Sequence, residues 1–392
     1  FRPTVNRPNR SNNRNAVSDF DSSRDEFFGK LSFAPTESIL LHGSYRTSDR
    51  EETGASVGGA SDAASTSVGN NATLDIAIAE GSWLINQNSF LSFKYTDFAN
   101  ETQSTPDNLL GLQPRLDGSV DLDVANLETQ GRFVVPLSLS NNTPAFNQFI
   151  VPIINRYGFP RNGVQTGGGS VGAGDLKNDQ DFFRESFQAG YDLVLGSNLT
   201  HELHVGYQYS LDEEDLLRTS NGWGIITVLG AGAQQFFNGQ PVSYQAQVQQ
   251  QGILSVPTVH SEYKSHNIEL NDVMKWRNFS FNVGLLASND QLFGQGLRPA
   301  SNNVSGFQLS KASKYKQYEL DFEDTLQPRL GAVWAYDKIN TVSVNYARYV
   351  PSASSLPRAA SWARNLAVTV NAFFDASGNF IGSAPEAASS GK

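Results

Sequence analysis

Cysteine is absent from this sequence of 392 residues, and methionine occurs once, at Met274. The chain therefore has no thiolate metal ligand, no disulfide framework and no cysteine nucleophile. It also lacks a run of about 18 apolar residues, the length that a membrane-spanning helix needs. Acidic residues outnumber basic ones by 39 to 29, and the net charge of −10 argues against nucleic acid as a partner.

The two ends of the chain also lack features of a complete exported protein. The N-terminal segment FRPTVNRPNRSNNRN is polar and contains no apolar stretch of the kind found in signal peptides. The C-terminus stops abruptly after ASSGK. We therefore expect a segment of a longer protein, cut at both ends.

Short runs of alternating apolar and polar residues are abundant, and this period of two is typical of β-strands. In the run from Ser38 to Arg46, for example, Ile39, Leu41 and Tyr45 share one face. Further runs start near Phe90, Phe187, Leu203, Phe279 and Val342. In each run one face is apolar or aromatic, and the other carries small and polar residues with few charges.

The links between these runs alternate in length. Short links with turn-forming residues lie at 35–37, 86–88, 196–198, 277–278 and 337–338. Long polar links cover roughly 50–71, 100–182, 212–260 and 292–314. Hairpins joined by long loops predict an all-β fold, an antiparallel transmembrane β-barrel with short periplasmic turns and long extracellular loops.

A soluble β-sandwich would alternate as well, but its outer face would carry more charge, and a link as long as 100–182 would be unusual in a compact domain. Aromatic residues gather near the predicted strand ends, where they suit the two interfacial girdles of a membrane barrel. They are Trp83, Tyr95, Tyr207, Tyr209, Trp276, Trp334, Tyr336, Tyr346 and Tyr349.

Four stretches resemble the barrel of TonB-dependent outer-membrane receptors, in particular the Oar-like branch. They are FFGKLSFAPTESILLHGSYRTSDRE from Phe27, SWLINQNSFLSFKYTDFANETQSTPDNL from Ser82, QPRLGAVWAYDKINTVSVNYARY from Gln327 and SLPRAASWARN from Ser355. The resemblance runs over most of residues 20–375 as scattered strand signatures, and the long loops match nothing in it.

This resemblance implies a 22-stranded barrel in the outer membrane, in contact with lipid and lipopolysaccharide. It also implies an N-terminal plug and a short motif that engages a TonB-type energy-coupling complex. Neither is present in this chain, where ten or eleven strands are readable, so residues 1–392 are expected to form part of one barrel domain. The function implied is energised transport of a bulky solute, whose identity the sequence does not give.

Two motifs invite a chemical interpretation that their context does not favour. His201 and His204 are three residues apart on a predicted strand, so they point to opposite faces and do not form a zinc site. The glycine-rich stretch 167–172 matches a dinucleotide fingerprint but lacks the flanking strand and helix, and we interpret it as a flexible loop tip.

Acidic residues cluster in two predicted loops, and neither cluster has the spacing of a calcium-binding EF-hand. We expect solvated loop charge at Asp212, Glu213, Glu214 and Asp215, and at Asp117, Asp121 and Asp123. The stretch 375–379 is predicted to be a turn between strands.

The sequence predicts no enzyme and no catalytic, cofactor-binding or metal site. Strand parity predicts instead a set of residues that face the lumen of the barrel. They are His42, Arg46, Lys94, Gln188, Asp192 and Gln208. A passive porin without a plug and a soluble extracellular β-rich binding or adhesion protein remain as alternatives.

Overall fold

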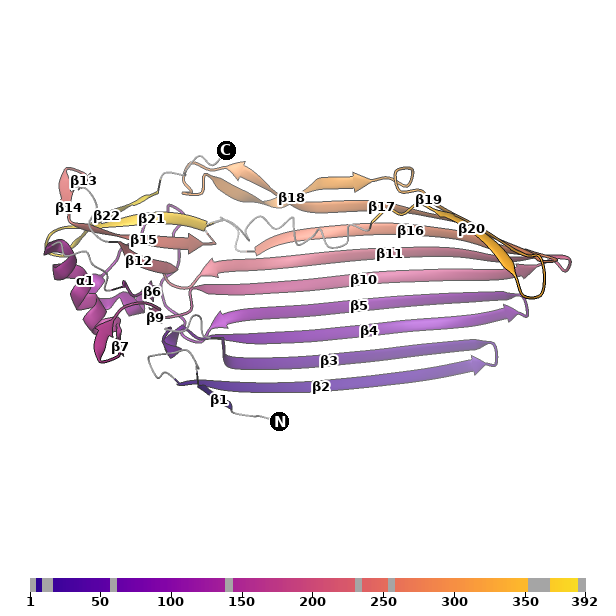
Figure 1. The fold of residues 1–392 in the computed structure, drawn as a ribbon, viewed down its shortest axis with the longest axis horizontal. Helices are drawn as coiled ribbons and strands as arrows, with labels where there is room; N and C mark the ends of the chain where they lie inside the picture. The colour runs from indigo at the N-terminus through magenta and orange to yellow at the C-terminus, as the bar shows by residue number, and fades with distance from the viewer. Residues whose placement is uncertain are drawn as a thin grey trace.

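The computed structural model describes residues 5–8, 17–56, 62–137, 144–229, 235–252, 258–351 and 367–386. Long antiparallel strands dominate it, so the predicted all-β antiparallel fold is confirmed. The described strands form a large sheet built from hairpins, a six-stranded sheet at one end of its strands, and two separate two-stranded sheets (Figure 1). None of the helices in these ranges is long and apolar enough to cross a membrane.

Neighbouring strands of the large sheet follow one another in chain order, with long excursions of the chain between some of them. Strand β18 pairs with β17 as a side branch of this order. Its described strands are β1 (Val5–Pro8), β2 (Val17–Thr36), β3 (Ile39–Ser56), β4 (Val68–Asn86), β5 (Ser89–Pro106), β10 (Leu176–Leu195), β11 (Leu199–Ser220), β16 (Thr258–Trp276), β17 (Phe279–Pro299), β18 (Phe307–Leu320), β19 (Gln327–Ala335) and β20 (Thr341–Ala347).

All five predicted short turns are confirmed, and they lie together at one end of the sheet, on the right in Figure 1. The strands themselves are longer than the sequence pattern predicted. The links expected at 50–71, 100–182, 212–260 and 292–314 lose residues at both ends to strands β3 to β5, β10, β11 and β16 to β18. The polar residues at the ends of these links extend the strands through backbone hydrogen bonds, although their side chains do not alternate between apolar and polar.

Each long strand has an apolar face, and in the main belt of the sheet this face is exposed. On β11, Val205 is 48% exposed, and it lies opposite Leu270 of β16. At the turn end, the Trp276 ring stacks 6.0 Å from Phe279, whose ring stacks 5.9 Å from Trp334. An exposed apolar belt bordered by aromatic rings is the outer surface of a β-barrel wall in the outer membrane.

The apolar belt has the height expected of such a wall. Ten residue steps separate Leu199, beside the aromatic stack, from Tyr209 on β11. At about 3.4 Å per residue and a tilt of about 40°, this stretch rises about 25 Å, the height of a barrel's apolar band. Among the described strands the ladder ends at β1 on one side and β20 on the other, so this part of the chain forms an open segment of wall.

The smaller sheet is built from two of the chain's excursions, between β5 and β10 and between β11 and β16, and from the segment 367–385 that follows β20. Its order is β22 (Phe380–Pro385), β21 (Ala367–Phe374), β15 (Tyr244–Gln251), β12 (Ile225–Leu229), β6 (Arg132–Val134) and β9 (Ser170–Gly172). Around it lie the helix α1 (Pro144–Tyr157), the 3₁₀ turns η1 (Ala64–Thr66) and η2 (Val124–Thr129), and the hairpins β7 (Phe159–Arg161) with β8 (Val164–Thr166) and β13 (Gln235–Phe237) with β14 (Gln240–Val242). We call this unit the loop domain. The turn predicted at 375–379 is confirmed, and it joins two strands of this unit.

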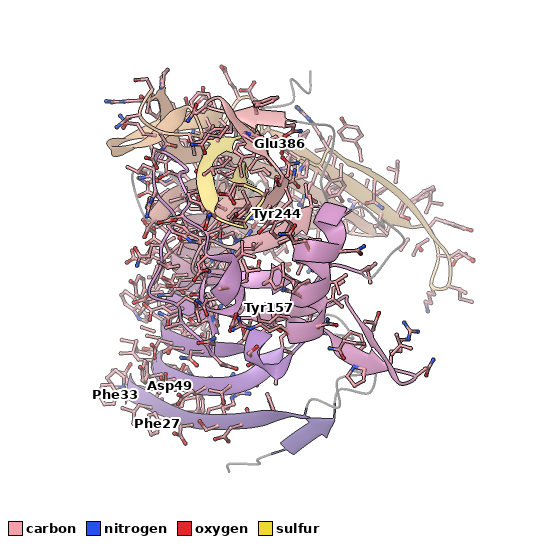
Figure 2. The ribbon with its side chains drawn as sticks, turned by 90° about the vertical axis from the view of Figure 1, so that its left-hand side faces the viewer. Phe27, Phe33, Asp49, Tyr157, Tyr244 and Glu386 are labelled. Carbon is pink, nitrogen blue, oxygen red and sulfur yellow. The ribbon has the colours of Figure 1, made fainter. Side chains whose placement is uncertain are left out.

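The loop domain has a hydrophobic core of its own. Phe133, Ile226 and Val248 are fully buried in it, and Tyr244 stacks on Phe374 with a ring separation of 4.7 Å. Figure 2 shows the domain at the near end of the strands, with Tyr157 and Tyr244 inside it. The loops predicted as polar links therefore fold into a packed unit.

Helix α1 explains part of this core. Ile150, Ile153, Ile154 and Tyr157 are spaced i, i+3, i+4 and i+7, and all four are buried. Their spacing gives the helix one apolar face, which packs against the small sheet. No helix was predicted here from the sequence.

The glycine-rich stretch 167–172 is not a flexible loop tip. Ser170–Gly172 forms strand β9, which is buried and pairs with β6, and the short strand β8 precedes it. A Cβ atom on Gly167 would lie 1.5 Å from the carbonyl oxygen of Pro136. Gly172 has a φ of 99°, in the region that favours glycine. The glycines are therefore required for close packing of backbone.

The two acidic clusters differ in structure. Asp117, Asp121 and Asp123 are exposed, as predicted, and Asp123 caps η2 by accepting a hydrogen bond from the Ala125 amide. The run at 212–215 is not loop charge, because it lies within β11. There Asp212 pairs with Arg184 on one face, and the buried Glu214 accepts a 2.5 Å hydrogen bond from Gln180.

Alkaline pH is expected to loosen the loop domain through Tyr157. Burial and a hydrogen bond to the Glu128 carboxylate raise the pKa of Tyr157 well above 10. The contribution of protonated Tyr157 to the stability of the loop domain is complete below pH 10. It is lost as the pH rises from there toward the pKa that Tyr157 has in the folded state. We expect Tyr157→Phe to reduce the loss of loop-domain stability between pH 9 and pH 12, measured by limited proteolysis. An unchanged pH dependence in this variant would contradict the assignment.

Candidate functional site

A continuous row of polar residues crosses the face of the large sheet opposite the apolar belt. Cross-strand register places each member directly beside the next, over eight adjacent strands. In order from β2 to β17 the residues are Ser32, His42, Glu80, Lys94, Gln188, Gln208, Asn267 and Ser288. We call this set the polar row.

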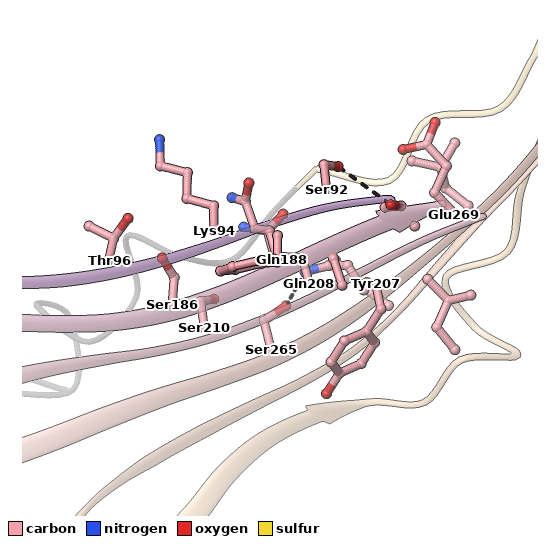
Figure 3. Close-up of a pocket in the computed structure, with 18 of the residues that line it drawn as sticks. Ser92, Lys94, Thr96, Ser186, Gln188, Tyr207, Gln208, Ser210, Ser265 and Glu269 are labelled. Carbon is pink, nitrogen blue, oxygen red and sulfur yellow. Dashed lines mark hydrogen bonds between the residues drawn. The ribbon is translucent and has the colours of Figure 1, made fainter. Parts of the chain in front are cut away.

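The polar row runs through a groove of about 970 Å³ on this face. Figure 3 shows Lys94, Gln188 and Gln208 along it, with the Tyr207 ring on the other side of the sheet. Next to the row, Asn267 donates a 3.0 Å hydrogen bond to Ser265, and Ser92 donates one of 3.4 Å to the Gly190 carbonyl. The groove is therefore lined by amides, hydroxyls and small residues, together with charged side chains such as Lys94, Arg184 and Asp290.

The structure brings together four of the six residues predicted to face the lumen. His42, Lys94, Gln188 and Gln208 all belong to the polar row and line the groove. That this face borders a transport lumen stays a proposal.

The other two predicted residues lie outside the groove lining. Arg46 forms an ion pair with Glu26 at 2.5 Å. Asp192 contacts Nδ1 of His204, a groove residue, at 2.7 Å, on the turn side of the row.

Glu80 and Asn267 are members of the polar row that were not predicted from the sequence. Both lie on strands without clear alternation, since β4 reads Leu74–Asp75–Ile76–Ala77–Ile78–Ala79–Glu80 and β16 is mixed throughout. The signal that would have found them is the register of the neighbouring strands. Lys94 pairs with Glu80, and Gln208 pairs with Asn267.

The two histidines of the HELH stretch do not share a site, as the strand parity predicted. His201 contacts Asp272 at 2.8 Å on the apolar face, whereas His204 contacts Asp192 on the polar face.

Chemically, the groove offers many neutral hydrogen-bonding groups and a few charges of both signs. Such a surface suits weak, repeated contacts with a hydrated solute.

Similarity to known proteins is found among solved structures. No protein-family model matches this chain, and no curated protein does. Among solved structures, the alcaligin outer-membrane receptor FauA from Bordetella pertussis aligns over 91% of this chain and 45% of its own, at 10% identity and a TM-score of 0.46. The ferric-catecholate import receptor Fiu from Escherichia coli K12, in its open form, aligns over 90% and 52%, at 10% identity and a TM-score of 0.46.

A third similar structure is the siderophore receptor PiuA from Acinetobacter baumannii, which aligns over 90% of this chain and 47% of its own. Its identity is 11% and its TM-score 0.43. This chain thus spans about half the length of the solved structures it matches. The stretch from Ser355 that contributed to the family resemblance lies outside the described residues.

Proposed function

We propose that residues 1–392 form part of one outer-membrane barrel domain of a TonB-dependent receptor, which transports a bulky solute across the membrane. The intact barrel would have 22 strands, and a plug and an energy-coupling motif would lie outside this chain. An Oar-like affiliation is part of the same proposal and rests on the sequence resemblance.

One observation carries this proposal. The same strands present a lipid-type apolar belt on one face and the polar row on the other, while a folded domain stands at the end opposite the short turns. In a closed barrel, strand pairing satisfies every backbone hydrogen-bonding group inside the hydrocarbon of the bilayer, and the inner face of the wall borders water. The loop domain would meet solutes before they reach the groove.

A soluble binding or adhesion protein is not favoured. Large apolar side chains stay exposed along the belt, and Val344 on β20 is 68% exposed. A soluble protein of this kind would expose an apolar patch far larger than monomers tolerate. A passive porin has the same wall and differs in lacking a plug.

Two measurements distinguish a receptor from a porin: the sequence of the full gene, and the ion conductance of the full-length protein. A signal peptide, a globular plug and a coupling motif upstream of Phe1, with further strands downstream of Lys392, would support the receptor. The full-length protein should then be nearly silent in planar lipid bilayers. Free ion conduction by that protein, or a signal peptide running directly into residue 1, would reject the receptor and leave the porin.

Lys94→Glu tests whether the polar row borders the conducting path. With the plug removed, we expect this variant to shift selectivity toward cations by about twofold or more, because it reverses a charge at the groove surface. The measurement is the reversal potential in a salt gradient. Lys338→Glu is the control, since Lys338 is exposed in a short turn. Equal shifts in both variants would contradict a role for the row.

A further inference from the structure

A second cluster of ionisable residues lies away from the groove, on the same face as the apolar belt but beyond it, toward the loop domain. Glu213 on β11 pairs in register with Glu262 on β16, and Asp215 pairs with His260. No register shift interrupts the ladder between Val205 and these residues, so strand parity places them on the belt side. They lie four or more residues past Tyr209, outside the apolar belt.

Glu213, His260 and Glu262 converge on one point. One ligand atom from each lies within 4.8 Å of the other two. The Nε2 atom of His260 is 3.6 Å from Glu213 Oε1 and 3.5 Å from Glu262 Oε1. Ligands of a tetrahedral zinc ion, at about 2.0–2.1 Å from the metal, are about 3.4 Å apart. The observed spacing is therefore close to that of a metal-binding set.

The orientation of His260 fits a metal ligand. Its Nδ1 atom lies 2.6 Å from Asp215 Oδ1, so the Nδ1–H group donates to that carboxylate. In the neutral imidazole the lone pair is then on Nε2, the atom that faces the two glutamates. A carboxylate that holds the other ring nitrogen in this way is a common partner of metal-ligating histidines.

Carboxylates outnumber cations around this point. Glu262 is 5% exposed, and the Lys264 ammonium, 3.4 Å from its second oxygen, offsets only one of these negative charges. On the neighbouring strands, Asp181 pairs in register with both Asp215 and Glu101. Burial and the nearby carboxylates raise the pKa of Asp181, which indicates a locally negative environment.

We propose that Glu213, His260 and Glu262 bind a divalent transition-metal ion of the zinc type, with Asp215 as a positioning residue that acts through His260. One nitrogen and two carboxylate oxygens suit such an ion, and a fourth position is open to water. No metal site was predicted from the sequence, because the ligands come from two strands 47 to 49 residues apart and are brought together only by the register of β11 and β16.

Zinc titration of the intact, tag-free protein folded in detergent, in competition with a chromogenic chelator, tests this site. We expect one ion per chain, with at least tenfold weaker binding in His260→Asn and in Glu213→Gln. Asp215→Asn should weaken binding about 10- to 100-fold, and Asp215→Glu should restore part of it. Cobalt(II) in place of zinc should give visible absorption bands, which His260→Asn abolishes and Asp215→Asn shifts.

His266→Asn is the matched control, because His266 lies on the same strand and face but contacts Tyr207, at 2.9 Å. It should keep the affinity and the cobalt spectrum of the parent chain. Far-UV circular dichroism establishes that each variant is folded, and Glu262→Gln replaces any that is not. The proposal is overturned if the parent chain binds no stoichiometric ion. His260 would then be a protonated side chain that forms ion pairs with the surrounding carboxylates, and not a metal ligand. Equal affinity in His260→Asn and His266→Asn overturns it too.

Discussion

Val205→Arg is expected to destabilise the folded protein in a lipid bilayer by about 2–4 kcal/mol, or to prevent its assembly. Val205 lies midway along the apolar belt of β11, between the aromatic stack near Leu199 and Tyr209. An arginine there would place a charge near the bilayer centre, where it loses hydration without gaining a partner. The measurement is reversible guanidinium unfolding of the intact protein in phospholipid vesicles.

Gln208→Arg is the matched control for this experiment. Gln208 lies three residues along the same strand, on the opposite face, and it lines the groove. The same substitution there keeps the charge in water and should change the free energy of unfolding by less than about 1 kcal/mol. Equal destabilisation by both variants would show that the two faces do not differ in environment, and the membrane assignment would fail.

The short turns and strand faces of the large sheet were largely predictable from the sequence. Turn residues at Gly196 to Asn198 and at Arg277–Asn278 fix hairpins whose register then runs without interruption. Alternation in these strands assigned Gln188 and Gln208 to one face, and the structure places them side by side. Local chemistry sufficed here because the pairing of each hairpin follows directly from its turn.

Other hairpins contain an irregularity that no local pattern revealed. Between β2 and β3 the register shifts after Thr36↔Ile39, and between β4 and β5 it shifts after Asn86↔Ser89. If the pairing of Asn86 with Ser89 continued along β4 and β5 without a shift, Glu80 would pair with Tyr95 in place of Lys94. A carboxylate would then lie beside an outward-facing ring. Such bulges depend on the twist of the whole sheet, so the polar row could be completed only from the structure.

The loop domain was missed for a different reason. Its strands are short, and their burial comes from contacts between excursions that are distant in the chain, such as β6 with β12 and β15 with β21. Val171 and Phe133 therefore had no local pattern to mark them as core. Helix α1 did carry a signal, the spacing of Ile150, Ile153, Ile154 and Tyr157, although Pro152 within it weakens a helical interpretation.

Phe133→Ala is expected to cost the loop domain about 3–5 kcal/mol, because it removes a fully buried ring from the centre of a small core. The ring packs edge-on against Tyr157, at 5.5 Å between centroids, and thus joins β6 to helix α1. A core of this size holds little excess stability, so we expect the loop domain to unfold while the large sheet stays intact. Limited proteolysis should then cut residues 107–175 first.

Phe236→Ala provides the comparison, since Phe236 on β13 belongs to the same loop domain but is 64% exposed. It should leave the proteolysis pattern unchanged, because its truncation opens no cavity. If Phe133→Ala instead unfolds both sheets together, the loop domain is an integral part of the wall's stability. If it alters solute capture while the wall stays folded, the extracellular role proposed for the loop domain gains direct support, since the groove residues are untouched.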